Sequence, residues 1–342
     1  MNDFDSLIFY IISFLFSATF YYIYNKKNYK FFLILSFCIP MIIGGLRYKV
    51  GTDYISYVGM YNNENKIDLG FIFISRISAQ LGGVQSLFFM YNSLTLIFIF
   101  MGLNNIDKKI RPFAYFCYLF LFYTTSFNIM RQFLAASIVF YAYKYIIKKE
   151  PIKWIIFIII AFIFHNTSIL CLPLYIILNS KSSKFKVIAL LGTVLIAFNY
   201  NSLLKIISGY STFDHYSLYL NDYGDTINNK MFFIDAIILI YILIFKKKLL
   251  KQDINNNTYI LLYIVSVILS LTGFFNPYVK RIGIYFSLPK IILLSEIPLI
   301  CSDKNIKILN YLFIIMHAVG IFIISAYVLK QANIIPYNMI GG

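Results

Sequence analysis

Arginine is scarce in this chain, and its positions mark where chemistry on an anion is expected. Only five of the 30 lysine and arginine residues are arginines. Three of them, Arg47, Arg131 and Arg281, stand in short polar clusters at the ends of long apolar segments. A guanidinium is a planar fork of N–H donors that matches the oxygens of phosphate or carboxylate. These positions therefore predict a site that grips a phosphate or a carboxylate.

The first polar cluster, residues 47–57, joins a basic pair to a Gly-Thr-Asp-Tyr sequence. Gly51 permits a turn with positive φ, and Thr52 or Asp53 is suited to cap a short helix that begins near Tyr54. An ordinary interfacial loop anchored by tyrosines is the alternative interpretation.

The second cluster places Arg131 and Gln132 at the start of an apolar segment, with Asn128 just before them. Small residues follow one turn later and allow close helix packing. An arginine this near the bilayer usually faces a partner or a cavity, whereas snorkelling to lipid headgroups is the alternative.

The third and fourth clusters contain a histidine and a second basic pair. His165 lies at the polar break of the apolar segment 154–178. A helix break exposes backbone N–H groups that suit an anion, although a lone membrane histidine is often structural. Lys280 and Arg281 precede a later apolar segment, and two basic clusters on one face suit a diphosphate.

The composition excludes a soluble domain. The 342 residues are 60% hydrophobic and 13% charged, whereas soluble domains carry roughly 25% charged residues. The net charge of +16 invites a nucleic-acid interpretation. However, the lysines fall in loops between apolar segments, where the positive-inside rule accounts for them. We therefore expect a polytopic membrane protein and no nucleic-acid partner.

A helical span needs about 20 mostly apolar residues, or fewer where helices tilt. About ten such spans are expected: residues 6–24, 31–46, 84–103, 112–127, 130–147, 187–207, 231–245, 259–275, 282–300 and 308–329. If every lysine run is cytoplasmic, these spans alternate correctly, provided that segment 154–178 begins and ends inside. The broken segment is then a re-entrant helical hairpin with His165 near the outer face; a single tilted crossing is the alternative.

The predicted fold is thus one all-α transmembrane domain over residues 1–342, a bundle of spans plus the broken hairpin. Both termini and the polar loops 47–83 and 208–230 are expected outside, so the outer face is the expected functional face. Several acidic residues are candidates there: Asp53, Glu64, Asp68, Asp214, Asp222, Asp225 and Asp235. The sequence lacks the HExxH, Walker A and GxSxG patterns, so we expect neither a metal nor any other cofactor.

The four clusters, in this order and spacing, resemble those of the Wzy-like polysaccharide polymerases of the EpsG type. The matching pieces are an Arg-Tyr-x-x-Gly-Thr-Asp-Tyr sequence from Arg47, Asn128-x-x-Arg131-Gln132, Phe164-His165-x-x-Ser168, and Lys280-Arg281 before Tyr285-Phe286. The resemblance covers nearly the whole chain. It departs at Lys49, where a small or apolar residue is common.

The resemblance implies a GT-C-like, metal-independent glycosyltransferase in the bacterial inner membrane that works at the outer, periplasmic face. Such enzymes join oligosaccharide repeat units carried on undecaprenyl diphosphate, which serves as donor and acceptor. The other expected partners are membrane lipid and, as an option left open, a chain-length regulator protein. An O-antigen ligase and a lipid-linked sugar flippase or transporter are the alternative functions; a transporter should show internal repeats and ionisable residues near the midplane.

Within that implied reaction, cations must stabilise the departing diphosphate, and a base must deprotonate the acceptor hydroxyl. Arg131 and Arg281 are the expected clamp, and Asp53 and His165 are the candidate bases, with the choice between them open. His165 could equally bind the diphosphate. The remaining expected substrate-binding residues are Arg47, Tyr48, Tyr54, Tyr57, Asn128, Gln132, Lys280 and Tyr285.

Overall fold

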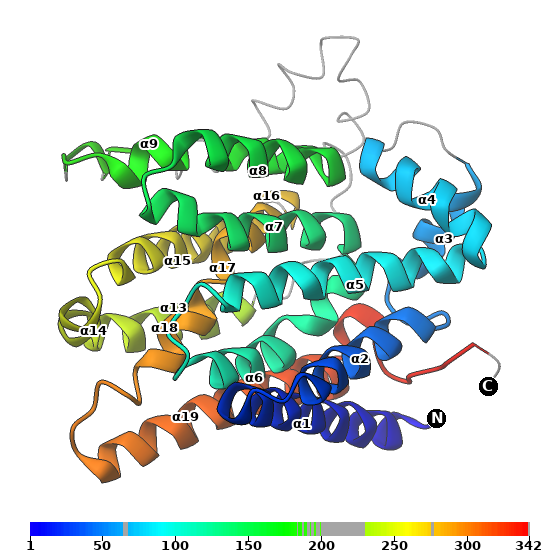
Figure 1. Cartoon of the computed structure of the whole chain (residues 1–342), viewed down its shortest axis with the longest axis horizontal. Helices are drawn as coiled ribbons and strands as arrows, with labels where there is room; N and C mark the ends of the chain where they lie inside the picture. The colour runs from blue at the N-terminus through cyan, green and yellow to red at the C-terminus, as the bar shows by residue number, and fades with distance from the viewer. Residues whose placement is uncertain are drawn as a thin grey trace.

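The apolar segments fold as helices throughout the part of the chain that the computed structural model describes, which comprises residues 1–63, 68–182, 230–274 and 277–340, with a few separate residues between 184 and 199 (Figure 1). Most of the expected span 187–207 and nearly all of the expected loop 208–230 lie outside the described residues. Apart from one isolated backbone bridge, Arg47 with Met339, the regular structure of the described residues is helical. The all-α expectation is therefore confirmed.

The first half of the chain supplies the core of the bundle. Asn2 caps the first helix, where its side chain accepts a hydrogen bond from the Asp5 amide at 2.7 Å, and acidic residues in the first turn favour the helix dipole. The helices of this half are α1 (Asp3–Lys27), α2 (Lys30–Leu46), α3 (Tyr54–Asn62), α4 (Leu69–Leu81), α5 (Val84–Leu103), α6 (Arg111–Leu121) and α7 (Met130–Ile147).

The second half is more broken. The expected single span 282–300 is interrupted, because Pro289 has no amide hydrogen to continue an α-helix from the turn before it. The helices of this half are α13 (Lys230–Ile244), α14 (Lys246–Gln252), α15 (Asn256–Leu271), α16 (Pro277–Ile282), α17 (Ile284–Ser287), α18 (Lys290–Glu296) and α19 (Lys304–Ile323).

Four helices within the described residues are long and apolar enough to cross a membrane, judged by length and composition. They are Asp3–Lys27, Val84–Leu103, Asn256–Phe274 and Lys304–Val328. Five shorter apolar helices accompany them, among them Lys30–Leu46 and Pro151–Phe164. These helices fit an all-α membrane protein, while the count of about ten spans and the GT-C-like fold stay predictions.

The broken segment 154–178 folds back on itself. Its outward limb is α8 (Pro151–Phe164), and its return limb is a 3-10 turn (Asn166–Cys171) followed by α9 (Leu174–Asn179). Trp154, at the start of α8, donates to the Leu172 carbonyl at 3.2 Å, and Asn179 donates to the carbonyl of Ile146 at the end of α7. The chain therefore returns to the side from which it started, as the hairpin interpretation requires.

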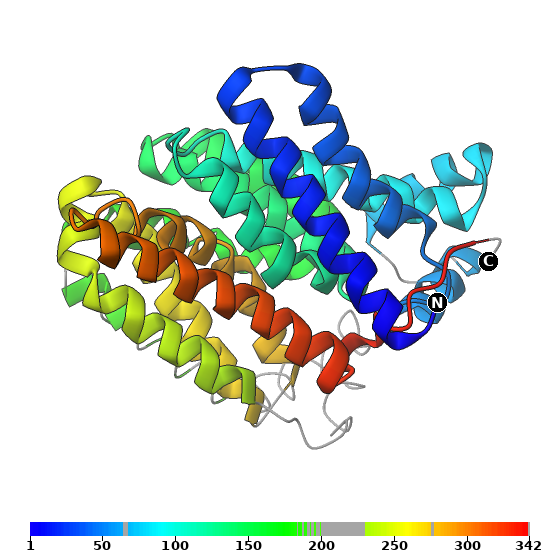
Figure 2. The same cartoon turned by 90° about the horizontal axis from the view of Figure 1, so that it is seen from below.

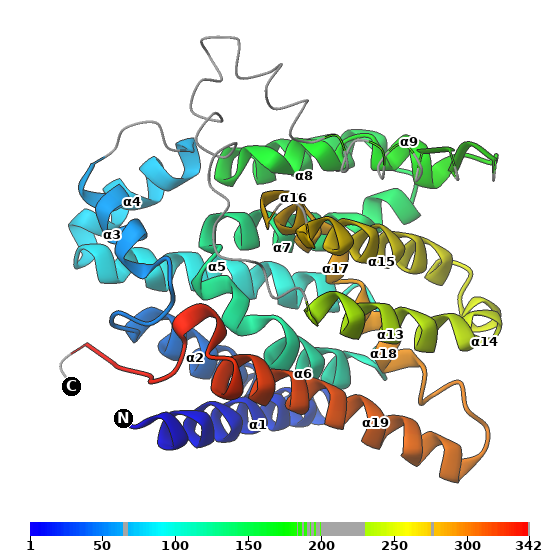
Figure 3. The same cartoon turned by 180° about the vertical axis from the view of Figure 1, so that it is seen from behind.

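The two ends of the bundle differ in composition. At one end, Asn25 of α1 donates to the Lys108 carbonyl, so the lysines that follow α1 lie near those that precede α6. Helix α14, with its lysines, lies at the same end (Figure 1). At the other end lie both termini, α3 and α4 (Figure 3). We call these the lysine end and the motif end.

The C-terminal residues tie the motif end together. After α19, which packs between α1 and α13 (Figure 2), the chain crosses over the loop that follows α2. The Ala332 carbonyl accepts from the Thr52 amide at 3.1 Å and from Asn128 at 3.2 Å, and the Tyr337 hydroxyl donates to the Ile43 carbonyl.

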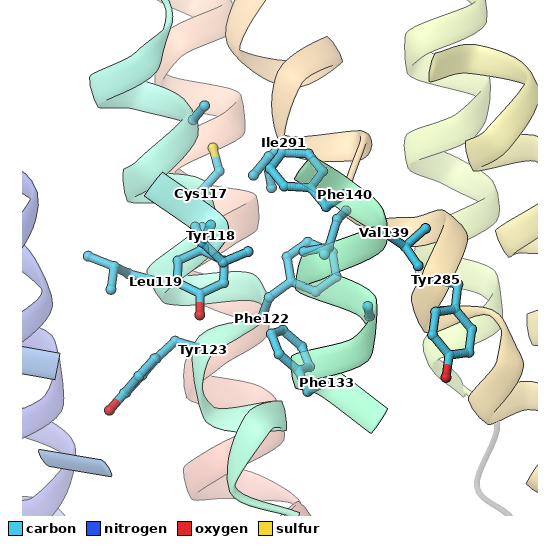
Figure 4. Close-up of a cluster of buried hydrophobic side chains, with 14 of the residues drawn as sticks. Cys117, Tyr118, Leu119, Phe122, Tyr123, Phe133, Val139, Phe140, Tyr285 and Ile291 are labelled. Carbon is cyan, nitrogen blue, oxygen red and sulfur yellow. The ribbon is translucent and has the colours of Figure 1, made fainter. Parts of the chain in front are cut away.

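An aromatic core fills the centre between α6, α7 and the α17–α18 region (Figure 4). An ion pair lies beside it: the ammonium group of the buried Lys290 is 2.9 Å from the half-buried Asp235 and 5.2 Å from the ring centroid of Phe122. Lys290 therefore pairs with a carboxylate of another helix, α13. Glu296, at the end of α18, accepts a hydrogen bond from Asn256 of α15.

Candidate active site at the motif end

The first and second polar clusters meet at Asn128. Its side-chain oxygen accepts from the Thr52 hydroxyl at 3.0 Å, and its backbone carbonyl accepts from the Tyr57 hydroxyl at 2.8 Å. The loop after α2 is therefore fixed against the turn that precedes α7.

The third and fourth clusters join the same assembly. Gln132 of α7 donates to the Arg281 carbonyl at 3.0 Å, which ties α16 to the second cluster. The Thr167 and Tyr285 hydroxyls are 2.9 Å apart, which ties the hairpin tip to α17. All four clusters thus lie at one end of the bundle, although they are spread over most of the sequence.

An acidic residue outside these clusters lies at the centre of the site. Arg131 Nη1 is 2.6 Å from the Asp68 carboxylate, and His165 Nδ1 is 3.6 Å from the same oxygen, Oδ2. The three side chains keep between 11% and 21% of their surface exposed. His165 Nδ1 is buried without a hydrogen-bond partner in this arrangement. A guanidinium, a carboxylate and an imidazole in contact can bind an anion and accept a proton.

The local backbone explains this placement. Arg131 lies in the first turn of α7, and His165 ends α8 in an extended conformation with φ of −159°. Asp68 immediately precedes α4, which approaches the hairpin closely at Gly70. A Cβ at Gly70 would lie 2.6 Å from the Phe164 ring and 2.9 Å from the Ile163 carbonyl oxygen. A residue without a side chain there lets α4 carry Asp68 to His165.

Arg47 lies behind the site. Its guanidinium is between the rings of Phe88 and Phe127, with centroid distances of 4.6 and 4.7 Å, and Nη1 donates to the Val50 carbonyl at 2.6 Å. The residue is 2% exposed, and burial lowers the pKa of the guanidinium to about 10. It remains protonated at neutral pH, but this aromatic box does not present it to a ligand.

The four tyrosines expected to bind substrate are mostly covered. Tyr54 stacks on Phe88 at 4.8 Å, and burial raises the pKa of the Tyr57 hydroxyl. Tyr285 is fully buried, whereas Tyr48 is 42% exposed. Of the four, Tyr48 is therefore the residue that this structure presents for stacking on a ligand.

The second basic pair is more open than Arg47. Arg281 is exposed and Lys280 is half-buried, and both lie on α16. Among the residues that the structure describes, no group of three or more His, Cys, Asp or Glu side chains is placed to hold a metal ion.

The sequence suggested Asp53 as the carboxylate base and Asp68 as one of several further acidic candidates. The structure gives these two residues different surroundings. Asp53 precedes α3, with its carboxylate 3.4 Å from the Thr52 hydroxyl, whereas Asp68 contacts both Arg131 and His165. In the sequence, Asp68 was recognisable only as one of several acidic residues in the expected outer loops. The sequence could not rank it first, because the packing of α4 on α8 is a tertiary contact.

These features define an all-helical membrane protein with a cationic, histidine-containing site at the end opposite its lysine runs. The chain belongs to the EpsG family, which matches residues 30–339. The match confirms the predicted resemblance and indicates a membrane protein of the polysaccharide polymerase type, with glycosyltransferase-like activity. Comparisons with curated proteins and with solved structures gave no match.

Proposed function

We propose that this protein polymerises oligosaccharide repeat units carried on undecaprenyl diphosphate, at the outer face of the bacterial cytoplasmic membrane. The observation that carries the proposal is the meeting of four distant polar clusters around Asp68, Arg131 and His165. This meeting occurs at the end of the bundle opposite the lysine runs, which the positive-inside rule assigns to the cytoplasm. The expected partners are the lipid-linked glycan, membrane lipid and, as an open option, a chain-length regulator protein.

In the proposed reaction, the bond between the donor sugar C1 and the diphosphate oxygen breaks, and a bond from C1 to the acceptor hydroxyl oxygen forms. Negative charge develops on the departing lipid diphosphate. Arg281 and Lys280 lie on one helix beside the site and are suited to stabilise this charge. Arg131 uses one nitrogen for Asp68, and its guanidinium has five N–H donors in all, so it completes the clamp.

His165 is the base in this scheme. The Asp68 carboxylate faces Nδ1 and favours the tautomer that carries its proton there, which leaves Nε2 to accept the proton of the acceptor hydroxyl. The carboxylate also stabilises the resulting imidazolium, as carboxylates do in other catalytic pairs with histidine. Asp68 thus acts through His165 as a positioning residue, and this assignment replaces Asp53 as the acid nearest the chemistry.

Arg47 has a supporting role in this proposal. Its aromatic box and its bond to the Val50 carbonyl hold the loop that carries Thr52, and Thr52 fixes Asn128. Arg47 therefore shapes the site without contacting the diphosphate.

The test is the lipid-linked glycan that accumulates after deletion of the gene. A polymerase deletion leaves single repeat units on the lipid, which mass spectrometry identifies, and the wild-type gene restores polymer. Full-length chains retained on the lipid indicate a ligase instead, and repeat units held on the cytoplasmic leaflet indicate a flippase. Either result contradicts the proposal.

The clamp is tested in the complemented deletion strain. Arg281→Ala should reduce polymer by about 10²-fold or more, the typical effect of losing a donor to developing negative charge. Arg76→Ala, at an exposed arginine on α4, is the matched control and should polymerise normally. Wild-type polymer from Arg281→Ala at equal membrane abundance would exclude the clamp.

A further inference from the structure

A long apolar groove leads away from the site along the side of the bundle. The groove lies between α15 and the return limb of the hairpin. Residues of α16 and α17 line it at the end nearer the candidate site. Figure 3 shows the hairpin and α15 side by side, with α16 at the motif end of α15. The volume of the groove is about 410 Å³, within the range of roughly 300–1,000 Å³ that small-molecule sites occupy.

The walls of the groove are hydrocarbon. On the return limb of the hairpin, Ile169 and Ile177 form one wall, and Leu262 and Val265 of α15 form the other. Among the described residues that line the groove, Lys186 alone is charged. A diphosphate therefore has a single counter-charge along these walls, that of Lys186, whereas an apolar chain is well matched to the rest of the lining.

One end of the groove adjoins the candidate active site. Ile169 follows His165 by one turn of the hairpin tip, and Val279 and Ile282, which also line the groove, flank Lys280 and Arg281. The hydrogen bond between Thr167 and Tyr285 joins the two sides of this end. A molecule with an apolar tail in the groove therefore has its head beside the cationic pair and His165.

We propose that the groove binds the polyprenyl tail of the lipid-diphosphate donor, an inference that rests on the proposed function. One apolar channel ending at a basic pair matches a single chain with a diphosphate head. Ordinary phospholipid has two shorter chains and competes for the same apolar surface. The groove is expected to bind the single polyprenyl chain in preference to it. Binding along the groove presents the C1–diphosphate bond of the donor to Arg281 and His165.

The direct test uses a long-chain polyprenyl diphosphate that carries a photoreactive diazirine on its tail, with the full-length protein in phosphatidylglycerol nanodiscs. Photolysis and mass spectrometry should place the label on peptides that contain residues 169–178 and 261–269. Unlabelled long-chain polyprenyl diphosphate should displace the label, and added phosphatidylglycerol should not. Equal displacement by phosphatidylglycerol would make the groove a general lipid site and overturn the proposal.

Adjacent positions on α9 supply a matched pair of variants. Ile177 lines the groove, whereas Ile176 is 67% exposed on the outside of the same helix. Ile177→Trp should reduce labelling by about tenfold or more, because the indole excludes at least one isoprene unit from the apolar walls. Ile176→Trp should label as the wild type does. Equal labelling of the two variants contradicts the proposal.

A polymerisation assay tests the groove proposal and the proposed function independently. With a long-chain donor, Ile177→Trp should raise KM by about tenfold, whereas a donor on farnesyl diphosphate should give similar rates in both variants. If the wild type makes no polymer but is labelled in the groove, the proposed function fails and the groove stands. If the wild type polymerises and Ile177→Trp keeps the wild-type KM for the long-chain donor, the groove fails and the function stands.

Discussion

At the residue scale, Asp68 is the side chain on which the site depends most. It contacts Arg131 at 2.6 Å and lies 3.6 Å from His165. Asp68→Asn keeps the size of the side chain but removes the charge that orients the imidazole. We expect polymerisation to fall by about 10²–10⁴-fold, the range attributed to general acid–base catalysis. The measurement is the initial rate with purified protein at matched folded concentration.

Asp53→Asn is the control for this variant, because Asp53 also lies at the motif end but contacts Thr52. It should lose much less activity than Asp68→Asn. A merely structural role for Asp68 would lower the unfolding temperature without altering the pH profile of kcat, whereas the proposed role changes the acidic limb of that profile. If Asp53→Asn lowers the activity more than Asp68→Asn does, the assignment of Asp68 as the carboxylate that positions His165 is wrong.

Gly51 is a second residue-scale constraint, set by the backbone. Its φ is +99°, and an added Cβ would lie 2.8 Å from Arg47 Nη1 and 2.9 Å from Asn128 Oδ1. Gly51→Ala should therefore destabilise the protein by roughly 1–3 kcal/mol, seen as a lower unfolding temperature in detergent. Gly59→Ala, inside α3 with no heavy atom within 4 Å of the added Cβ, should be neutral or slightly stabilising.

At the element scale, the site depends on how closely α4 approaches the hairpin tip. The separation of the two helices is set by Gly70, where a Cβ would meet the Ile163 carbonyl oxygen at 2.9 Å. Gly70→Ala should push α4 outwards and separate Asp68 from Arg131 and His165. Activity should fall at least about tenfold, since small displacements of catalytic groups have large effects. Cross-linking between cysteines introduced on α4 and α8 reports the displacement independently.

Gly320→Ala is the matched control for this substitution, because Gly320 lies in α19 with no heavy atom within 4 Å of an added Cβ. Its activity should equal that of the wild type. Retention of full activity and unchanged cross-linking in Gly70→Ala would show that the close approach of α4 is not needed.

At the scale of the whole molecule, the lysine end and the motif end should lie on opposite sides of the membrane. Lys251→Cys, on α14, and Gln80→Cys, on α4, place exposed thiols at the two ends. In intact cells without an outer membrane barrier, an impermeant maleimide should label the cysteine at position 80 and should reach position 251 only after lysis. Labelling of both positions before lysis contradicts this topology.

Much of the architecture could be predicted from the sequence because bilayer insertion depends on local properties. Apolar length, lysine runs and the polar break at His165 indicated the helices, their two ends and the hairpin. The α7 helix was predicted at its observed bounds, Met130–Ile147. The segment around Pro289 was predicted less well. Its apolar composition indicated one continuous span, but the missing amide hydrogen of Pro289 interrupts the helix.

The sequence by itself determined that this is an all-helical membrane protein of the EpsG family with its polar clusters at one end. Only the tertiary structure decided which members of those clusters meet. It buried Arg47 between Phe88 and Phe127, and it brought Asp68 to Arg131 and His165. The physical reason is that insertion follows from the composition of each segment alone, whereas a contact between side chains depends on the packing of helices that are distant in the sequence.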